Sequence, residues 1–295
     1  MKQIVVLSGK GGTGKTFVTS SLAAIISNAV YADCDVDAAN LHLMLSPVIR
    51  RTEPFVGGVI ASVDTARCTG CGLCVDHCRF DAISMEGQTA VVDAVACEGC
   101  GVCKLVCPAD AVALAEEEAG AWFCSQTEVG PMVHATLNPG AENSGKLVEQ
   151  VRRTAVEEAE RTGAEWLVID GPPGTGCAAK SAITGTDFAL LVTEPTASGA
   201  HDLERIVRLA EFFGIPMGLL VNKSSLDEER TGELHDFAQK REIPLLGDIE
   251  FDRSVAEAIT RLRLYQRDHE NAVTETLRLC WTQLCERRSE EHTSE

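Results

Sequence analysis

The 295-residue sequence is poor in basic residues and has no long apolar run. Its 26 Lys and Arg residues face 44 Asp and Glu residues, and the net charge of −18 disfavours binding to nucleic acid or to an anionic membrane by bulk electrostatics. No apolar run reaches the roughly 18 residues of a membrane-spanning helix, and no signal pattern precedes the first predicted strand. We therefore expect a cytoplasmic protein without an integral membrane segment and without a nucleic-acid partner.

Hydrophobic residues make up 45% of the chain, which is typical of a globular protein with a sizeable core, and the length suggests about two domains. There are 13 cysteines. Because the chain carries no export signal, these thiols indicate metal ligation rather than disulfides.

A glycine-rich loop organises the amino-terminal part of the chain. It follows the apolar run 4–7, precedes a helical apolar pattern over 17–26, and consists of Gly9, Lys10, Gly11, Gly12, Thr13, Gly14, Lys15 and Thr16. In a strand–loop–helix of this kind, backbone N–H groups surround phosphates at the positive end of the helix. Lys15 is expected to reach the β/γ-phosphates, and the Thr16 hydroxyl is expected to ligate Mg²⁺.

A second nucleotide signal follows the apolar strand 166–169. The stretch from Asp170 to Gly176 reads Asp-Gly-Pro-Pro-Gly-Thr-Gly. An aspartate at the end of a parallel strand is placed to hold the water shell of Mg²⁺, and a backbone N–H near Gly174 is placed to sense the γ-phosphate. A plain turn between strand and helix is the alternative.

Eight cysteines form an internal duplication. The first group is Cys68, Cys71, Cys74 and Cys78, and the second group repeats its spacing without change at Cys97, Cys100, Cys103 and Cys107. Zinc ribbons usually separate two C-x-x-C pairs by a longer spacer, whereas this tight spacing suits an iron–sulfur cubane. Zinc remains the alternative metal.

The extra lysine, Lys10, gives the loop the form K-G-G-x-G-K-T, in which the chain resembles the MinD/ParA and nitrogenase iron protein class of P-loop ATPases. The resemblance implies that Lys10 crosses a homodimer interface to the partner's nucleotide. It also implies that Asp35 orients the attacking water, that Asp33 supports the Mg²⁺ region, and that Asn222 contacts adenine. Because position 225 is serine and not the aspartate of an N-K-x-D motif, we expect ATP rather than GTP.

The cysteine repeat resembles a bacterial ferredoxin with two [4Fe–4S] clusters, in which the fourth cysteine of each run binds the other cluster. This resemblance implies one cluster on Cys68, Cys71, Cys74 and Cys107, and a second on Cys97, Cys100, Cys103 and Cys78. Arg79 stands where the motif has proline, and a cation there is expected to raise the potential of the second cluster.

Two further cysteines suggest a third site. Cys177 stands at the same offset from Asp170 as a cluster ligand of the nitrogenase iron protein, and Cys124 follows the cysteine repeat. The hypothesis is a third, intersubunit cluster held by Cys124 and Cys177 of two subunits. The alternative is two thiols with no ligand role.

The carboxyl-terminal segment is predicted to be a helix over about 269–287 with one apolar face. Packing on the sheet is the favoured interpretation, and membrane binding is the alternative. Residues 288–295, Arg-Ser-Glu-Glu-His-Thr-Ser-Glu, resemble the translation of a sequencing adapter, and we interpret them as a non-native tail.

Taken together, the motifs predict an α/β P-loop ATPase domain over 1–52 and 119–287, with a parallel sheet and helices on both faces. Residues 53–118 are predicted to form an inserted α+β ferredoxin domain. The pattern resembles MinD-superfamily ATPases, among them Mrp-like proteins. It implies an ATP-hydrolysing homodimer that binds Mg²⁺ and passes single electrons to an unknown redox partner. The alternatives are an iron–sulfur cluster carrier and a redox-sensing spatial regulator.

Overall fold

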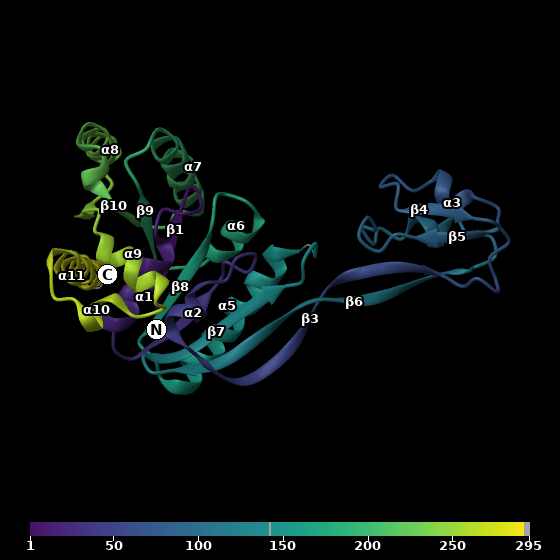
Figure 1. Ribbon diagram of the computed structural model, residues 1–295, viewed down its shortest axis with the longest axis horizontal. Coiled ribbons are helices and arrows are strands. Elements are labelled where there is room, and N and C mark those ends of the chain that lie inside the picture. Colours follow the sequence, from purple (N-terminus) through teal and green to yellow (C-terminus); the bar gives the residue numbers. More distant parts are fainter. Residues whose placement is uncertain (142, 292–295) are drawn as a thin grey trace. The chain divides into compact units, whose positions relative to one another are not determined.

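The computed structural model describes residues 1–141 and 143–291, with the side chains of 267, 268 and 287–291 left out (Figure 1). The chain divides into two compact units. The first contains Met1–Thr52, Trp122–Thr136 and the chain from Ser144 onward, and the second contains Glu53–Ala121 and Leu137–Asn143.

The first unit is built on a sheet whose inner strands are buried on both faces. The run Val5, Val6 and Leu7 is completely buried, and Leu167–Ile169 beside it is buried as well. Continuous apolar runs of this kind are typical of parallel strands covered by helices on both sides. The strand order across the sheet is β11 (Leu245–Ile249), β10 (Met217–Asn222), β9 (Phe188–Thr193), β1 (Lys2–Ser8), β8 (Trp166–Pro173), β2 (Ala29–Asp33), β7 (Gly130–Leu137), β6 (Val112–Thr127) and β3 (Val48–Val63).

Helices cover both faces of this sheet. On one face, alternate strand residues such as Ile4 and Val6 share a core cluster with side chains of α1 (Lys15–Ile25) and α11 (Ala272–Glu291). The intervening Val5 and Leu7 point to the other face. Three further helices contact β1, β2, β8 and β9, namely α5 (Ser144–Thr162), α6 (Cys177–Ile183) and α7 (Ala197–Phe213).

The sheet is mixed and not wholly parallel, which corrects the sequence prediction. The six pairings from β11 through β7 are parallel. However, only Glu128 and Val129 join β6 to β7, and a connection of that length permits only antiparallel neighbours. The sequence of β3 hid this arrangement, since most of the residues in its first half are exposed and show no alternation.

In its described residues, the second unit contains two short helices and a two-stranded antiparallel sheet. Its elements are α3 (Leu73–Asp76), β4 (Ile83–Glu86), β5 (Thr89–Val92) and α4 (Val102–Leu105), together with parts of β3 and β6. The two helices occupy equivalent positions in the two copies of the cysteine repeat. The left-handed residues Gly70, Gly72 and Asp81 recur at the equivalent positions Gly99, Gly101 and Asp110. The sequence duplication is therefore also a duplication of backbone conformation.

The carboxyl-terminal helix α11 packs on the sheet, as the favoured interpretation predicted. Val273, Leu277, Cys280 and Leu284 are buried in the core cluster that contains α1. Among the described residues, no helix is long and apolar enough to cross a bilayer. The interpretation of 288–295 as a foreign tail concerns residues whose side chains lie outside the described part of the chain.

The remaining elements are α2 (Leu41–Leu45), the 3₁₀ turn Ser224–Leu226, α8 (Glu228–Lys240), α9 (Arg253–Thr260) and α10 (Tyr265–Asp268). Two of these helices have capped starts. Asp227 accepts a hydrogen bond from the N–H of Arg230, and Asp252 accepts one from the N–H of Ser254.

Candidate functional site

The glycine-rich loop links β1 to α1 and depends on glycine at two crowded positions. Gly14 adopts a left-handed conformation with φ of 98°, and a Cβ there would lie 2.2 Å from Nδ2 of Asn222. A Cβ on Gly9 would lie 2.2 Å from the carbonyl oxygen of Asp202. Gly12 also has positive φ, at 81°. The loop conformation therefore requires glycine and leaves its backbone at the start of α1, where phosphates bind.

Asn222 lies at the end of β10 and holds the loop. Its Nδ2 donates to the carbonyl oxygen of Thr13 at 2.7 Å, and its Oδ1 accepts from the N–H of Lys223 at 3.0 Å. Both ends of the amide are therefore engaged by the protein. The adenine contact that the sequence implied for Asn222 stays a prediction, and the structure shows in addition a contact of this side chain with the phosphate loop.

Asp170, in the carboxyl-terminal half of β8, is completely buried beside the loop. Its Oδ2 accepts from the Thr16 hydroxyl at 2.7 Å, and its Oδ1 accepts from the Thr19 hydroxyl at 3.0 Å. Burial raises the pKa of Asp170, while the Lys15 ammonium and the two hydroxyls oppose that shift. The structure therefore brings together the two groups that the sequence assigned to Mg²⁺, Thr16 and Asp170.

Two further aspartates lie on the same edge of the sheet, Asp33 as the last residue of β2 and Asp35 just after it. Asp33 is completely buried and accepts backbone N–H bonds from Asp35 and Leu41, and burial and the nearby Asp170 raise its pKa well above the usual range. Asp35 is less buried. Burial raises the pKa of Asp35 to about 6, although the Lys15 ammonium lowers it. Asp35 is thus an anion near neutral pH and takes up a proton in mildly acidic solution.

A cavity of about 750 Å³ lies over these groups. Its walls include Lys15, Thr16 and Asp35, and Pro172 and Pro173 from the second motif. The size is suited to a nucleotide-sized ligand.

The predicted contact between a γ-phosphate and a backbone N–H near Gly174 stays a prediction. The N–H of Gly174 donates to the carbonyl oxygen of Ser8 at 3.0 Å and is not free. A contact from this N–H to a γ-phosphate therefore requires that hydrogen bond to break.

Lys10 is bound within its own chain. Its ammonium forms an ion pair with Glu194 at 2.7 Å and donates to the hydroxyls of Thr196 at 2.9 Å and Ser198 at 2.8 Å. An ammonium has three protons, so all of its donors are used. Glu194 also binds Lys223 at 2.8 Å, and Lys223 donates to the carbonyl oxygen of Gly12 at 3.0 Å.

The first cysteine set predicted for a cluster lines a single cavity in the second unit. Cys68, Cys71, Cys74 and Cys107 surround it, together with apolar side chains such as Val63 and Val112. Backbone N–H groups of Ala90 and Gly70 hold the pKa of the Cys68 thiol below its usual value. The last cysteine of the second repeat therefore lies with the first three of the first repeat.

In the second set, Cys97 and Cys100 lie near enough to Cys103 to raise its pKa, after the larger effect of burial. Among the side chains that the structure describes, no three His, Cys, Asp or Glu residues are grouped to hold one metal ion. A structural zinc ion and an iron–sulfur cubane both need four converging ligands, so this finding bears equally on the two, and zinc stays the alternative metal.

Comparison with known proteins identifies the fold of the first unit. The sequence matches the CobQ/CobB/MinD/ParA nucleotide binding domain over residues 4–264. An uncharacterised protein of Methanocaldococcus jannaschii is 36% identical over 229 residues, which cover 76% of this chain and 79% of that protein. This chain belongs to the CobQ/CobB/MinD/ParA family.

The resemblance to MinD is found both in sequences and in solved structures. The septum site-determining protein MinD of Synechocystis is 22% identical over 85% of this chain and 77% of its own length. The fold is similar to that of Pyrococcus horikoshii MinD complexed with Mg-ADP, with a TM-score of 0.56, 21% identity and coverage of 95% and 94% of the two chains. This likeness shows a MinD-like fold, and the family match identifies a nucleotide binding domain.

Within this family fold, the structure does not bring Cys124 and Cys177 together. Cys124 is buried near Glu157 and Glu158, whereas a Cβ on Gly145 would lie 3.1 Å from Cys177. Gly145 and Glu157 lie near opposite ends of α5, about 18 Å apart along the helix axis. Cys124 also accepts a hydrogen bond from Arg51. The hypothesis of a third cluster therefore gains no support from the geometry.

Three residues of the nucleotide site were not predicted from the sequence, namely Thr19, Glu194 and Lys223. Thr19 follows Thr16 by one helical turn, and this spacing alone could have placed it on Asp170. Glu194 had no local signal, since both of its lysine partners, Lys10 and Lys223, are distant from it in the sequence.

Proposed function

We propose that this chain is an ATP-hydrolysing switch that carries two [4Fe–4S] clusters in its second unit and controls single-electron transfer to a partner protein. The observation that supports it most is the cavity lined by Cys68, Cys71, Cys74 and Cys107, in a chain that also has a complete phosphate loop. Cys68, Cys71 and Cys74 belong to the first half of the duplication, and Cys107 belongs to the second half. Two-cluster ferredoxins bind each cluster in this crossed way.

The nucleotide half of the proposal rests on four side chains. Lys15 would bind the β/γ-phosphates of ATP, Thr16 would ligate Mg²⁺, and Asp170 would hold the metal through water. Mg²⁺ supplies positive charge to the phosphate oxygens. Pyrococcus horikoshii MinD, which has a similar fold, is complexed with Mg-ADP, and this supports the same ligand here. Asp35, ionised above a pKa of about 6, would orient the attacking water.

A homodimer would form when Lys10 exchanges partners. In the single chain its three donors are taken by Glu194, Thr196 and Ser198. Phosphate oxygens of a second subunit's ATP would replace these acceptors, and the lysine would stabilise negative charge in phosphoryl transfer. Glu194 would then keep Lys223 as its partner, which leaves the bond from Lys223 to Gly12 intact.

For the cysteines, we propose the cluster ligands that the resemblance to two-cluster ferredoxins implies. One cluster would use Cys68, Cys71, Cys74 and Cys107, and the other would use Cys97, Cys100, Cys103 and Cys78. Bound clusters supply reversible single-electron chemistry. The unit has few apolar side chains in its core, among them Ala61, Ile83, Ala90 and Val112, so bound clusters would also stabilise its fold.

Iron and acid-labile sulfide measured on anaerobically purified protein test this assignment. We expect about eight irons and eight sulfides per chain. In the crossed arrangement, the double variant Cys68→Ser/Cys107→Ser damages one cluster only and keeps about four irons. The matched variant Cys68→Ser/Cys103→Ser damages both clusters. Zinc without sulfide, or equal iron loss in the two double variants, would contradict the proposal.

A further inference from the structure

A second cavity lies at the end of α1 that is opposite to the phosphate loop. Its volume is about 500 Å³, and it is lined by residues of α1, α10 and α11 and by Val129. Its lining shares no residue with that of the nucleotide cavity. The volume falls within the roughly 300–1,000 Å³ that is usual for small-molecule sites.

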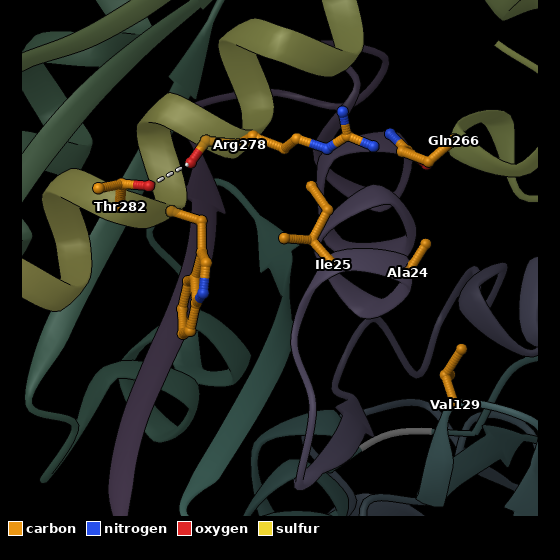
Figure 2. A pocket seen from close by; sticks show the side chains of 7 residues that line it. Ala24, Ile25, Val129, Gln266, Arg278 and Thr282 are labelled. Atoms are coloured by element: carbon orange, nitrogen blue, oxygen red, sulfur yellow. Dashed lines mark hydrogen bonds between the residues drawn. The ribbon is translucent and has the colours of Figure 1, made fainter. Parts of the chain in front are cut away.

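Gln266 supplies a polar group that points to a ligand. The side chain is only 9% exposed, and neither its amide nitrogen nor its amide oxygen has a hydrogen-bond partner. Figure 2 shows the amide and the Arg278 guanidinium pointing toward one another above Ile25 and Ala24. A buried polar group without a hydrogen-bond partner destabilises a protein, so such a group is usually paired. A ligand that offers both a donor and an acceptor would satisfy the amide.

Arg278 supplies an exchangeable positive charge. Its guanidinium donates two hydrogen bonds to Glu270, at 2.7 Å and 2.6 Å. Both side chains are half exposed or more, at 51% and 69%, and exposed ion pairs of this kind are weak. A phosphate or carboxylate is an equally good bidentate acceptor and can replace Glu270.

The remaining walls favour a flat ring. Trp281 contributes a partly buried indole, which packs edge to face on Trp166 with 4.6 Å between ring centroids. Ala24, Ile25 and Val129 add apolar surface, and Thr282 completes the lining. Indole faces pair well with planar heteroaromatic rings.

We propose that this cavity binds an anionic ligand whose planar ring presents an N–H donor beside a C=O acceptor. Uridine monophosphate and flavin mononucleotide share this chemistry. The ring edge would pair with the Gln266 amide, the ring face would contact Trp281, and the phosphate would bind Arg278. The proposal depends neither on the role of the cysteines nor on ATP hydrolysis.

The test uses the full chain saturated with Mg-ADP, so that the phosphate-loop site is filled. Flavin mononucleotide, riboflavin, uridine monophosphate and uridine are titrated by calorimetry, with tryptophan fluorescence as a second readout. We expect one site per chain for at least one phosphorylated probe, and at least tenfold weaker binding of its unphosphorylated form. The ring that binds more tightly identifies which of the two ligand types the cavity takes.

Single variants assign the contacts. Gln266→Leu and Trp281→Leu are each expected to weaken binding at least tenfold, and Arg278→Gln is expected to remove the preference for the phosphorylated probe. Glu270→Gln removes the competing carboxylate and is expected to tighten binding. Gln239→Leu, an exposed glutamine on α8, is the matched control and is expected to change nothing.

Gln266→Leu also separates loss of binding from loss of folding. Because this change removes an unpaired buried amide, Tm is expected to be no lower than in the unmodified chain. The proposal is overturned if no probe saturates a site, if Mg-ADP displaces the probes, or if Gln266→Leu and Trp281→Leu bind them with unchanged affinity.

Discussion

Replacing Glu194 with glutamine is expected to strengthen ATP-dependent dimerisation. The Glu194 carboxylate is 12% exposed and binds Lys10 at 2.7 Å and Lys223 at 2.8 Å. The variant removes the negative charge that keeps Lys10 on its own chain, and it leaves the hydroxyls of Thr196 and Ser198 in place. The free energy needed to move Lys10 to a second subunit's nucleotide is then lower, because no ion pair has to be broken.

The size of the effect follows from the exposure of the pair. Lys10 is 25% exposed, and a partly exposed ion pair contributes about 1 kcal/mol. Closure of a symmetric dimer breaks two such pairs, one in each subunit. The free energy of dimerisation of the variant is therefore about 2 kcal/mol more favourable, which corresponds to a roughly 30-fold lower dimer Kd.

Sedimentation velocity over a concentration series measures this Kd, with Mg-ATP present and Asp35→Asn added to both proteins to stop hydrolysis. Glu204→Gln is the matched control, because Glu204 lies on the nearby helix α7 and pairs with Arg208 and Arg241 instead. Unchanged or weaker dimerisation of the Glu194→Gln protein would refute the reasoning. An equally large fall in the dimer Kd without nucleotide would refute the reasoning as well.

Three further predictions concern single residues. Gly14→Ala is expected to weaken nucleotide binding roughly 10- to 100-fold, measured by calorimetry, because strain of about 1–3 kcal/mol arises from a Cβ 2.2 Å from Nδ2 of Asn222. The ATPase rate is expected to fall about tenfold per pH unit below pH 6, as Asp35 (pKa about 6) gains its proton, and a rate that stays unchanged between about pH 7 and about pH 5 would contradict this role. Cys177→Ser is expected to keep about eight irons per chain, whereas Cys107→Ser is expected to lose roughly half of them by the same assay.

Much of the nucleotide site could be predicted because its signals are local. The loop from Gly9 to Thr16 and the start of α1 follow from adjacent residues, and Asp170 follows from a buried strand that ends in an acid. The contact from Asn222 to Thr13 joins residues 209 positions apart, and no pattern near either residue indicates it.

The sheet was predicted incompletely for a related reason. Parallel strands such as β1 and β8 are apolar throughout most of their length, so composition reveals them. Strands β3 and β6 are 16 residues each and carry many exposed side chains, because each contributes residues to both units. Their hydrophobic pattern is therefore set by two environments, and neither half has a clear period of two.

The cysteine repeat gave the most specific prediction for the second unit because its two copies have identical spacing. The conformations of Gly70, Gly72 and Asp81 and their counterparts repeat with it, since positive φ in both copies follows from similar local sequences. The position of Cys107 beside Cys68 is a tertiary feature, and only the family resemblance predicted it.

The most direct test of the account is the rate at which reduced protein transfers electrons to an external one-electron acceptor. Anaerobic stopped-flow absorbance follows cluster oxidation with Mg-ATP, with a non-hydrolysable analogue, and with no nucleotide. We predict that Mg-ATP changes the rate, that the analogue does not reproduce this change, and that Lys15→Ala abolishes it. Identical rates in all three conditions, with about eight irons bound and ATP being hydrolysed, would contradict the coupling of the nucleotide switch to electron transfer.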